Sequence, residues 1–346
     1  MKSIIYLYTE VMPYQVCIYK KLSELGFRVN VFFEDTQRQT PYEAPHINNV
    51  YYYKETSFSQ DNLLRFIDET NPQILVVCGW SNKKYLKVAK IIKKRKQIPV
   101  VCPIDSQVLG TIKQKIGFFI SSLYIKTAFD YIWVSGVRQY EFARKLGYDI
   151  DHILMYSLSG NTELFETANI DHKLLEYPKK LLFVGRFNEV KGLKPLLQAW
   201  NLITDKKGWV LHLVGNGPLE SEIRNCQNVI VSSFMSQEEL VRLTDSCGVF
   251  VLPSIYEPWA LVLQEFAAAG LPILCSSICG ASPHFVINNY NGYTFTAGDV
   301  LDMKDKILKM INLTPEDLVR MSERSRILSR YVDVDRSVAS LLSILG

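Results

Sequence analysis

Residues 249–277 read VFVLPSIYEPWALVLQEFAAAGLPILCSS, and this stretch decides the fold. Its first residues, Val249–Leu252, form a short apolar and β-branched run, which is typical of a buried strand. Pro258 suits the first position of a helix, where no backbone N–H is needed, and Gly270 followed by Pro272 is a common helix stop. Another apolar run, PILCSS, follows. The stretch therefore predicts strand, loop, helix and strand, which is one βαβ unit.

Two carboxylates interrupt this apolar stretch. Glu257 is predicted to lie in the loop at the carboxyl end of the strand, and Glu265 about two turns along the helix. An ionised carboxylate in a dry core is costly unless it is paired or faces a polar ligand. Glu265 therefore either points to solvent from a mostly buried helix or meets a polar ligand.

Strand-like runs and helical patterns alternate along the whole chain of 346 residues. Such alternation predicts parallel sheets covered by helices on both faces, and the length suggests two domains. The predicted class is α/β with two doubly wound domains, separated where the periodic pattern lapses at 154–180. The expected strands are IIYLY (4–8), RVNVFF (28–33), ILVVCG (74–79), PVVCPI (99–104), YIWVS (131–135), KLLFVG (180–185), VLHLVG (210–215), VIVSSF (229–234), VFVLPS (249–254) and PILCSS (272–277), and the helices expected in the first half are Val16–Leu25, Asp61–Thr70, Lys83–Lys96 and Gln139–Leu146.

The composition excludes several classes of function. A net charge of +4 with a pI near 8.5 is too small to indicate nucleic-acid binding, and no motif of that kind is present. The seven cysteines show no regular spacing, which favours a reducing compartment and a cytoplasmic protein. Cys275 and Cys279 lack neighbouring ligands, so we expect no metal site. The apolar run at the N-terminus is too short for a signal peptide.

Two segments have features found in helices that bind a membrane surface. Ile116–Ile125 is apolar but too short to span a bilayer, and it is either a core helix or a helix that lies on a membrane. The predicted helix Lys83–Lys96 carries a lysine-rich face, formed by Lys83, Lys87, Lys90 and Lys94. This face is either simply solvated or attracts anionic lipid, with Lys113 and Lys115 adding to the charge.

Two further stretches have the character of anion sites. In LLFVGRFNEVKGLKPLLQAW (181–200), a strand ends at Gly185, Arg186 and Lys191 lie in a loop, and Gly192 opens a helix. Helix N-termini beyond the carboxyl ends of strands bind anions, although such a loop is often merely solvated. In LHLVGNGPLESEI (211–223), Gly215 and Gly217 permit a tight turn close to a ligand, or form an ordinary βα turn.

Taken in this order, the three stretches resemble the retaining GT-B glycosyltransferases of glycosyltransferase family 4, also called glycosyl transferases group 1. The resemblance is carried by Gly185–Arg186, Lys191–Gly192, Gly215-x-Gly217–Pro218, Glu257 and Glu265 with seven residues between them, Gly270–Pro272, Asn291–Gly292 and Ala297–Asp299. It is strong over 180–300 and weaker before. It implies two Rossmann-like domains that face a central cleft. The acceptor-binding domain would comprise 1–158 plus 330–346, where 329–345 resembles a helix that crosses back, and 159–329 would bind the nucleotide-sugar donor.

The resemblance also implies roles for particular residues. Glu257 would lie beside the hydroxyls of the donor sugar, and Glu265 would accept hydrogen bonds from the ribose. Arg186 and Lys191 would hold the diphosphate, which fixed cations can stabilise as it departs. Gly215, Gly217 and the backbone amides of Trp259, Ala260 and Leu261 would complete the donor site, with no bound metal and no cofactor other than the UDP- or GDP-linked donor.

The sequence departs from the family pattern at several places. Ala260 stands where the family has a glycine. His284 replaces an acid, and we expect it to be a loop histidine. In the first domain the matching position for a catalytic His or Asp is Asp105, which is otherwise a candidate helix N-cap.

The function implied is a retaining hexosyltransferase. It would move a hexose to a hydroxyl of a glycan or lipid-linked acceptor in bacterial surface polysaccharide synthesis (O-antigen, lipopolysaccharide or capsule), at the inner face of the plasma membrane. Two alternatives stay open: a catalytically silent scaffold that binds sugar nucleotides, and a GT-B sugar-nucleotide epimerase. A nicotinamide dehydrogenase is disfavoured because GxGxxG is missing.

Overall fold

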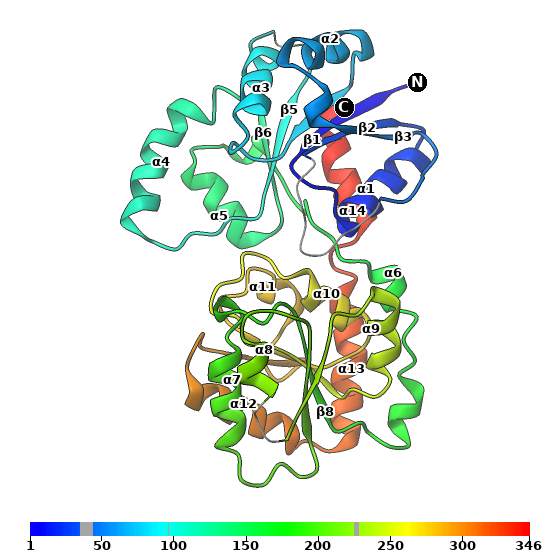
Figure 1. Ribbon diagram of the computed structural model, residues 1–346, viewed down its shortest axis with the longest axis vertical. Coiled ribbons are helices and arrows are strands. Elements are labelled where there is room, and N and C mark those ends of the chain that lie inside the picture. Colours follow the sequence, from blue (N-terminus) through cyan, green and yellow to red (C-terminus); the bar gives the residue numbers. More distant parts are fainter. Residues whose placement is uncertain (35–43, 96, 225–227) are drawn as a thin grey trace. The chain divides into compact units, whose positions relative to one another are not determined.

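A computed structural model of the protein describes residues 1–34, 44–95, 97–224 and 228–346 (Figure 1). The chain forms two compact units: Met1–Ser159 with Val334–Gly346, and Gly160–Asp333. The sequence predicts domain boundaries after residue 158 and before residue 330. In the structure the units divide after Ser159 and before Val334. The last residue of the predicted helix Lys83–Lys96 lies outside the described residues.

Among the described residues, the first unit contains a seven-stranded parallel sheet with the order β3-β2-β1-β4-β5-β6-β7. Its strands are β1 Ser3–Tyr8, β2 Arg28–Phe33, β3 Val50–Lys54, β4 Ile74–Val77, β5 Val100–Ile104, β6 Tyr131–Val134 and β7 Ile153–Leu154. Its helices are α1 Pro13–Glu24, α2 Gln60–Thr70, α3 Lys83–Arg95, α4 Ile112–Tyr124, α5 Val137–Lys145 and α14 Val334–Leu342, with the 3₁₀ turns η1 Glu55–Ser57, η2 Ile150–His152 and η5 Ser343–Leu345.

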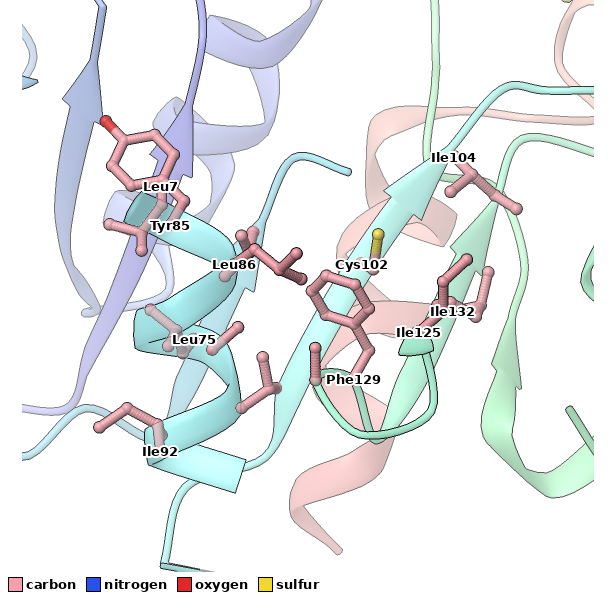
Figure 2. Packing of buried hydrophobic residues seen from close by; sticks show 14 of the residues in the cluster. Leu7, Leu75, Tyr85, Leu86, Ile92, Cys102, Ile104, Ile125, Phe129 and Ile132 are labelled. Carbon is pink, nitrogen blue, oxygen red and sulfur yellow. The ribbon is translucent and has the colours of Figure 1, made fainter. Parts of the chain in front are cut away.

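Helices cover both faces of this sheet, so its central strands are short apolar runs, as is typical of parallel sheets. All six residues of β1 are buried. On one face α3 and the segment after α4 pack on the sheet, and Figure 2 shows this cluster, which includes Leu7, Leu75, Tyr85, Leu86, Ile92, Cys102, Ile104, Ile125, Phe129 and Ile132. On the other face lie α1 and α14, joined by an ion pair of 2.5 Å between Lys21 and Asp335. The last helix is thus part of the first unit's core.

The second unit repeats the plan. Among its described residues, a six-stranded parallel sheet has the order β10-β9-β8-β11-β12-β13. Its strands are β8 Lys180–Val184, β9 Val210–Val214, β10 Val229–Ser232, β11 Val249–Leu252, β12 Ile273–Ser276 and β13 Gly292–Phe295. Its helices are α6 Thr162–Phe165, α7 Leu193–Asn201, α8 Glu220–Arg224, α9 Gln237–Thr244, α10 Leu261–Ala268, α11 Ser282–Phe285, α12 Val300–Ile311 and α13 Pro315–Ser329, with η3 Asp171–Leu174 and η4 Glu189–Lys191.

In both sheets the direction of strand addition reverses next to the first strand. In the second unit β8 and β9 lead outward to β10, and the chain then returns to place β11 on the other side of β8. The loops that follow β8 and β11 therefore leave their neighbouring strands toward opposite faces. Open α/β sheets bind ligands at this position, the topological switch point.

The sequence-based prediction of two doubly wound α/β domains is confirmed, with three local corrections. The helix expected to begin at Pro258 begins at Leu261, because Ala260 takes a left-handed backbone conformation. The strands β3, β7 and β13 were not predicted. The segment 329–345 is not one helix, since α13 ends at Ser329 and α14 begins at Val334.

Candidate functional site

The candidate site lies in the second unit, in the loops that follow β8, β9 and β11. These strands are neighbours in the sheet and run parallel, so their carboxyl ends share one edge. Of the predicted site residues, Arg186, Lys191, Gly215, Gly217 and Glu257 fall in these loops, and Glu265 lies on the helix that follows them.

The loops after β8 and β11 are joined by their backbones. The amide of Ile255 donates to the carbonyl of Val190 at 2.8 Å. Gly192 has φ +67°, and a Cβ built there would lie 2.0 Å from the carbonyl oxygen of Pro253. A glycine is therefore required at this position for both conformation and space.

The side chains of Lys191 and Glu257 form an ion pair at the switch point. Nζ lies 2.5 Å from Oε2, and the two side chains are 22% and 12% exposed. The hydroxyl of Ser254 donates to the same Oε2 at 3.1 Å. An ammonium group has three N–H donors, so this lysine can contact an anion while it keeps its carboxylate partner.

Arg186 precedes this pair at the end of β8 and is exposed. Within the described part of the chain, no ion pair or hydrogen bond of its guanidinium is found. Arginine offers a planar fork of donors that matches phosphate oxygens. The residue thus supplies a second cation at the same edge as Lys191.

The turn after β9 lies against the β8 loop. A Cβ on Gly215 would lie 1.9 Å from the carbonyl oxygen of Gly185, and one on Gly217 would lie 2.5 Å from that of Phe187. The amide of Phe187 donates to the carbonyl of Asn216 at 2.8 Å. These glycines permit the close approach of two backbones; no direct contact with a ligand is needed to explain them.

Glu265 is buried on α10, at 8% exposure, so the alternative of a solvent-exposed acid is wrong. The side-chain amide of Gln237 donates to its Oε1 at 3.0 Å, and the backbone N–H of Asn161 also bonds to the carboxyl. Burial raises the pKa of Glu265 to about 7, while the bond from Asn161 acts in the opposite direction. Sequence reasoning missed both partners, since neither belongs to a motif.

The start of α10 carries an unusual backbone. Ala260 has φ +85° and ψ +77°, a conformation that favours glycine, which the resemblance also leads one to expect there. The preceding Trp259 is buried, and its carbonyl accepts from the amide of Ala281 at 2.8 Å. Leu261 is the first residue of the helix proper.

His284 lies in the short helix α11, which corrects the expectation of a loop histidine. It is buried beside Trp259, with ring centroids 5.4 Å apart. Burial lowers the pKa of His284 to about 4. The ring is therefore neutral at physiological pH, and it packs against Trp259 and Phe285.

Asp105 belongs to the other unit. It follows β5 and is exposed, and its carbonyl accepts from the side-chain amide of Gln139 at 3.1 Å. The N-cap of α4 is Thr111, whose hydroxyl accepts from the amide of Gln114 at 3.2 Å, so the N-cap alternative for Asp105 is wrong. Its carboxylate and that of Glu10 contribute to a raised pKa of Tyr14, whose main cause is burial.

No group of three or more His, Cys, Asp or Glu side chains that could hold a metal is found in residues 1–34, 44–95, 97–224 and 228–346. Cys275 and Cys279 are both buried. In the same ranges no helix has the length and apolar character needed to span a bilayer.

Residues 165–327 match the family model described as Glycosyl transferases group 1. An uncharacterized glycosyltransferase of Haemophilus influenzae is 27% identical over 173 residues, which cover 48% of this chain and 49% of that protein. The amylovoran biosynthesis glycosyltransferase AmsK of Erwinia amylovora is 27% identical over 152 residues, or 39% of this chain and 37% of that protein. The chain thus spans about half or less of these relatives' length.

Solved structures match over the whole chain. Sucrose-phosphate synthase of Thermosynechococcus elongatus superposes with a TM-score of 0.78 at 16% identity, covering 100% of this chain and 98% of that one. HepE of Anabaena, solved in complex with UDP, gives 0.74 at 15% identity, covering 100% and 99%. The fold is therefore GT-B. Its second unit contains a domain that matches the glycosyl transferases group 1 family.

Proposed function

We propose that the chain is a retaining glycosyltransferase that moves a hexose from a nucleotide diphosphate sugar to a hydroxyl of a glycan or glycolipid. The observation that carries the proposal is the Lys191–Glu257 ion pair of 2.5 Å at the switch point of the second unit. It combines a cation suited to phosphate with a carboxylate suited to sugar hydroxyls.

Lys191 and Arg186 would neutralise the diphosphate. In the reaction the acceptor oxygen forms a bond to the anomeric carbon while the bond from that carbon to the β-phosphate oxygen breaks. The acceptor proton passes to the departing phosphate. Negative charge on the phosphate grows during bond breaking, so fixed cations stabilise the transition state more than the bound donor. This arrangement requires no bound metal.

Glu265 would accept hydrogen bonds from the ribose hydroxyls. Its carboxyl is already held by Gln237 and Asn161, so its orientation is fixed before the nucleotide binds. Hydrogen bonds donated to a carboxylate favour its ionised form, so ribose binding would lower the pKa of Glu265 from its raised value.

The names of similar proteins support the substrate class. HepE of Anabaena was solved with UDP and with UDP-glucose. AmsK of Erwinia amylovora is named for amylovoran biosynthesis and CapM of Staphylococcus aureus for capsular polysaccharide biosynthesis. We propose a UDP- or GDP-linked hexose as donor and a surface polysaccharide or its lipid-linked precursor, at the inner face of the plasma membrane, as acceptor.

The first test is thermal unfolding of the purified protein with UDP, GDP, ADP and their sugar derivatives, in the presence of EDTA. A ligand that binds only the folded protein raises its stability. We expect a selective rise with one nucleotide, and Arg186→Ala should reduce it. If no nucleotide raises the unfolding temperature, Arg186, Lys191 and Glu265 do not bind the proposed ligand.

The second test distinguishes sugar transfer from epimerisation and from donor binding without catalysis. With the selected donor, release of the nucleoside diphosphate in the presence of an acceptor indicates transfer. Conversion of the donor sugar into an isomer would indicate an epimerase instead. Donor binding without turnover over a wide panel of acceptors would favour the silent scaffold.

A further inference from the structure

Helix α4 presents an apolar face to solvent. Phe119 is 83% exposed and Leu123 is 76% exposed, which is unusual for side chains of this size. The exposed apolar residues of the helix recur at spacings of three and four, so they share one face. They are Ile112, Ile116, Phe119, Ile120 and Leu123.

This face does not contribute to the core of its unit. The helix is held instead by Phe118, whose ring packs on that of Phe142 at 5.0 Å, and by the buried Ser121. Immediately after the helix, Ile125 and Phe129 enter the core, as Figure 2 shows. Figure 1 shows α4 at the outer edge of the first unit, beside α5. The exposed face is therefore available to a partner without any change in the fold.

The charge around this face has one sign. Residues 106–129 contain no Asp or Glu but include Lys113, Lys115 and Lys126, all exposed. At the C-terminal end of the helix, Nζ of Lys90 lies 4.0 Å from the centre of the Tyr124 ring. Apolar side chains framed by lysines match the acyl boundary and the anionic head groups of a bilayer.

The lysines of helix α3 divide into two groups. Lys84 pairs with Glu55 at 2.5 Å, and Lys93 pairs with Asp130 at 3.2 Å. These two lysines form ion pairs within the unit, and neither belongs to the lysine-rich face predicted from the sequence. A member of that face, Lys90, contacts the ring of Tyr124 on α4. The apolar face and its lysines belong mainly to α4.

We propose that α4 lies in the head-group region of an anionic membrane, with Phe119 and Leu123 inserted and Lys113, Lys115 and Lys126 near the lipid phosphates. A second copy of the chain is a poorer partner, because a two-fold contact through this face would bring lysines against lysines. An anionic lipid surface complements both the apolar face and the charge. This inference does not depend on the proposed sugar transfer.

The test is co-sedimentation of the purified protein with vesicles of phosphatidylcholine alone and of phosphatidylcholine mixed with phosphatidylglycerol. We expect binding to the mixed vesicles that weakens as salt is added. The double variant Lys113→Gln, Lys115→Gln should lower the partition coefficient about fivefold for each lysine, which corresponds to about 1 kcal/mol per basic residue. The matched control Lys304→Gln, Lys309→Gln on α12 should leave it unchanged.

The apolar face is tested by the double variant Phe119→Ala, Leu123→Ala, which should lower the partition coefficient about tenfold or more. The control Leu301→Ala, Ile327→Ala removes exposed apolar side chains of the second unit, at 64% and 60% exposure, and should have no effect. Unfolding temperatures of all variants should match the parent, since the replaced side chains are exposed or, for Lys304, half-buried.

Three outcomes would overturn the inference: no binding to the mixed vesicles, equal binding to neutral vesicles, or binding that the α4 variants leave intact. If vesicles are not bound but the protein dimerises, and Phe119→Ala, Leu123→Ala abolishes the dimer, the face is an interface between copies.

Discussion

The two units have the same order of strands around their first strand, but their switch points differ in chemistry. In the second unit the loops after β8 and β11 bring Lys191 to within 2.5 Å of Glu257 and place Arg186 nearby in sequence. In the first unit the chain leaves β1 through Glu10. Burial is the main cause of the raised pKa of Tyr14, and the carboxylates of Asp105 and Glu10 add to it.

The glycines show the same contrast. A Cβ on Gly215 would strike the carbonyl oxygen of Gly185 at 1.9 Å, whereas a Cβ on Gly79, which follows β4, would meet nothing within 4 Å. The second unit has tightly joined loops with cations, which suit a phosphate. The corresponding loops of the first unit carry the carboxylates of Glu10 and Asp105, which can accept hydrogen bonds from hydroxyl groups. Under the proposed function, the loops of the second unit would bind the phosphates of the donor, and those of the first unit would bind the hydroxyl of the acceptor.

The largest effect is expected from Lys191→Ala. Its loss removes a cation from the site where charge is proposed to grow in the transition state, so the turnover number should fall about 100- to 1,000-fold while donor affinity falls less. Steady-state kinetics of transfer and a separate titration with donor would measure the two effects.

Lys194→Ala is the matched control for this experiment. Lys194 lies on α7, three residues further along, and pairs with Glu189 at 2.9 Å and Glu222 at 3.4 Å. Its replacement should leave turnover unchanged. Equal turnover of the Lys191→Ala variant and the parent would remove Lys191 from the mechanism.

Glu265→Gln should change the pH dependence of stability. Burial raises the pKa of Glu265 from 4.5 to about 7, so between these values the folded protein retains a proton that the unfolded chain has lost. The contribution of the protonated carboxyl is complete below pH 4.5 and is lost as pH rises through 7. The free energy of unfolding of the variant minus that of the parent should therefore rise by about 3 kcal/mol from acid to neutral pH.

Urea unfolding at several pH values would measure this difference, and the exposed Glu163→Gln should show none. The same carboxyl predicts a ligand effect. Affinity for a nucleotide diphosphate sugar should fall as pH decreases below 7, because ribose binding favours the ionised form. A flat profile in the parent would contradict the assignment of the ribose to Glu265.

Asp105→Asn tests the other side of the comparison. Donor affinity should be unchanged, because Asp105 belongs to the first unit, whereas Arg186 and Lys191 belong to the second. Transfer should fall about tenfold, the effect of losing a hydrogen bond to a charged group. The exposed Asp151→Asn of the same unit serves as control. Weaker donor binding in the Asp105→Asn variant would show that the two switch points do not divide the ligands as proposed.

Local sequence patterns predicted most of the fold because buried parallel strands are short apolar runs. The exceptions have physical reasons. β3 pairs on one side only and carries the exposed Tyr51, and β13 begins with Gly292, so neither has the composition of a buried strand. β7 has two residues, too few for any pattern.

The sequence indicated the residues of the candidate site but not the contacts between them. Glycines, cations and acids at strand ends were visible in the sequence. The pairing of Lys191 with Glu257 joins residues 66 positions apart, and that of Gln237 with Glu265 joins residues 28 apart. Such contacts arise only when loops of different strands meet, so composition and spacing do not specify them. The buried state of Glu265 follows from the same packing.

The smallest effect is expected from Ala260→Gly, at the edge of the second switch point. A left-handed conformation costs alanine about 1–2 kcal/mol, and glycine loses about 0.5–1 kcal/mol more conformational entropy on folding. The variant should therefore be about 0.5 kcal/mol more stable than the parent, as measured by urea unfolding. Ala267→Gly, in the last turn of α10, should instead lose about 1 kcal/mol because its backbone is helical. If both replacements destabilise the protein alike, the φ of +85° at Ala260 is not a source of strain, and the helix start is held by the packing of Trp259 alone.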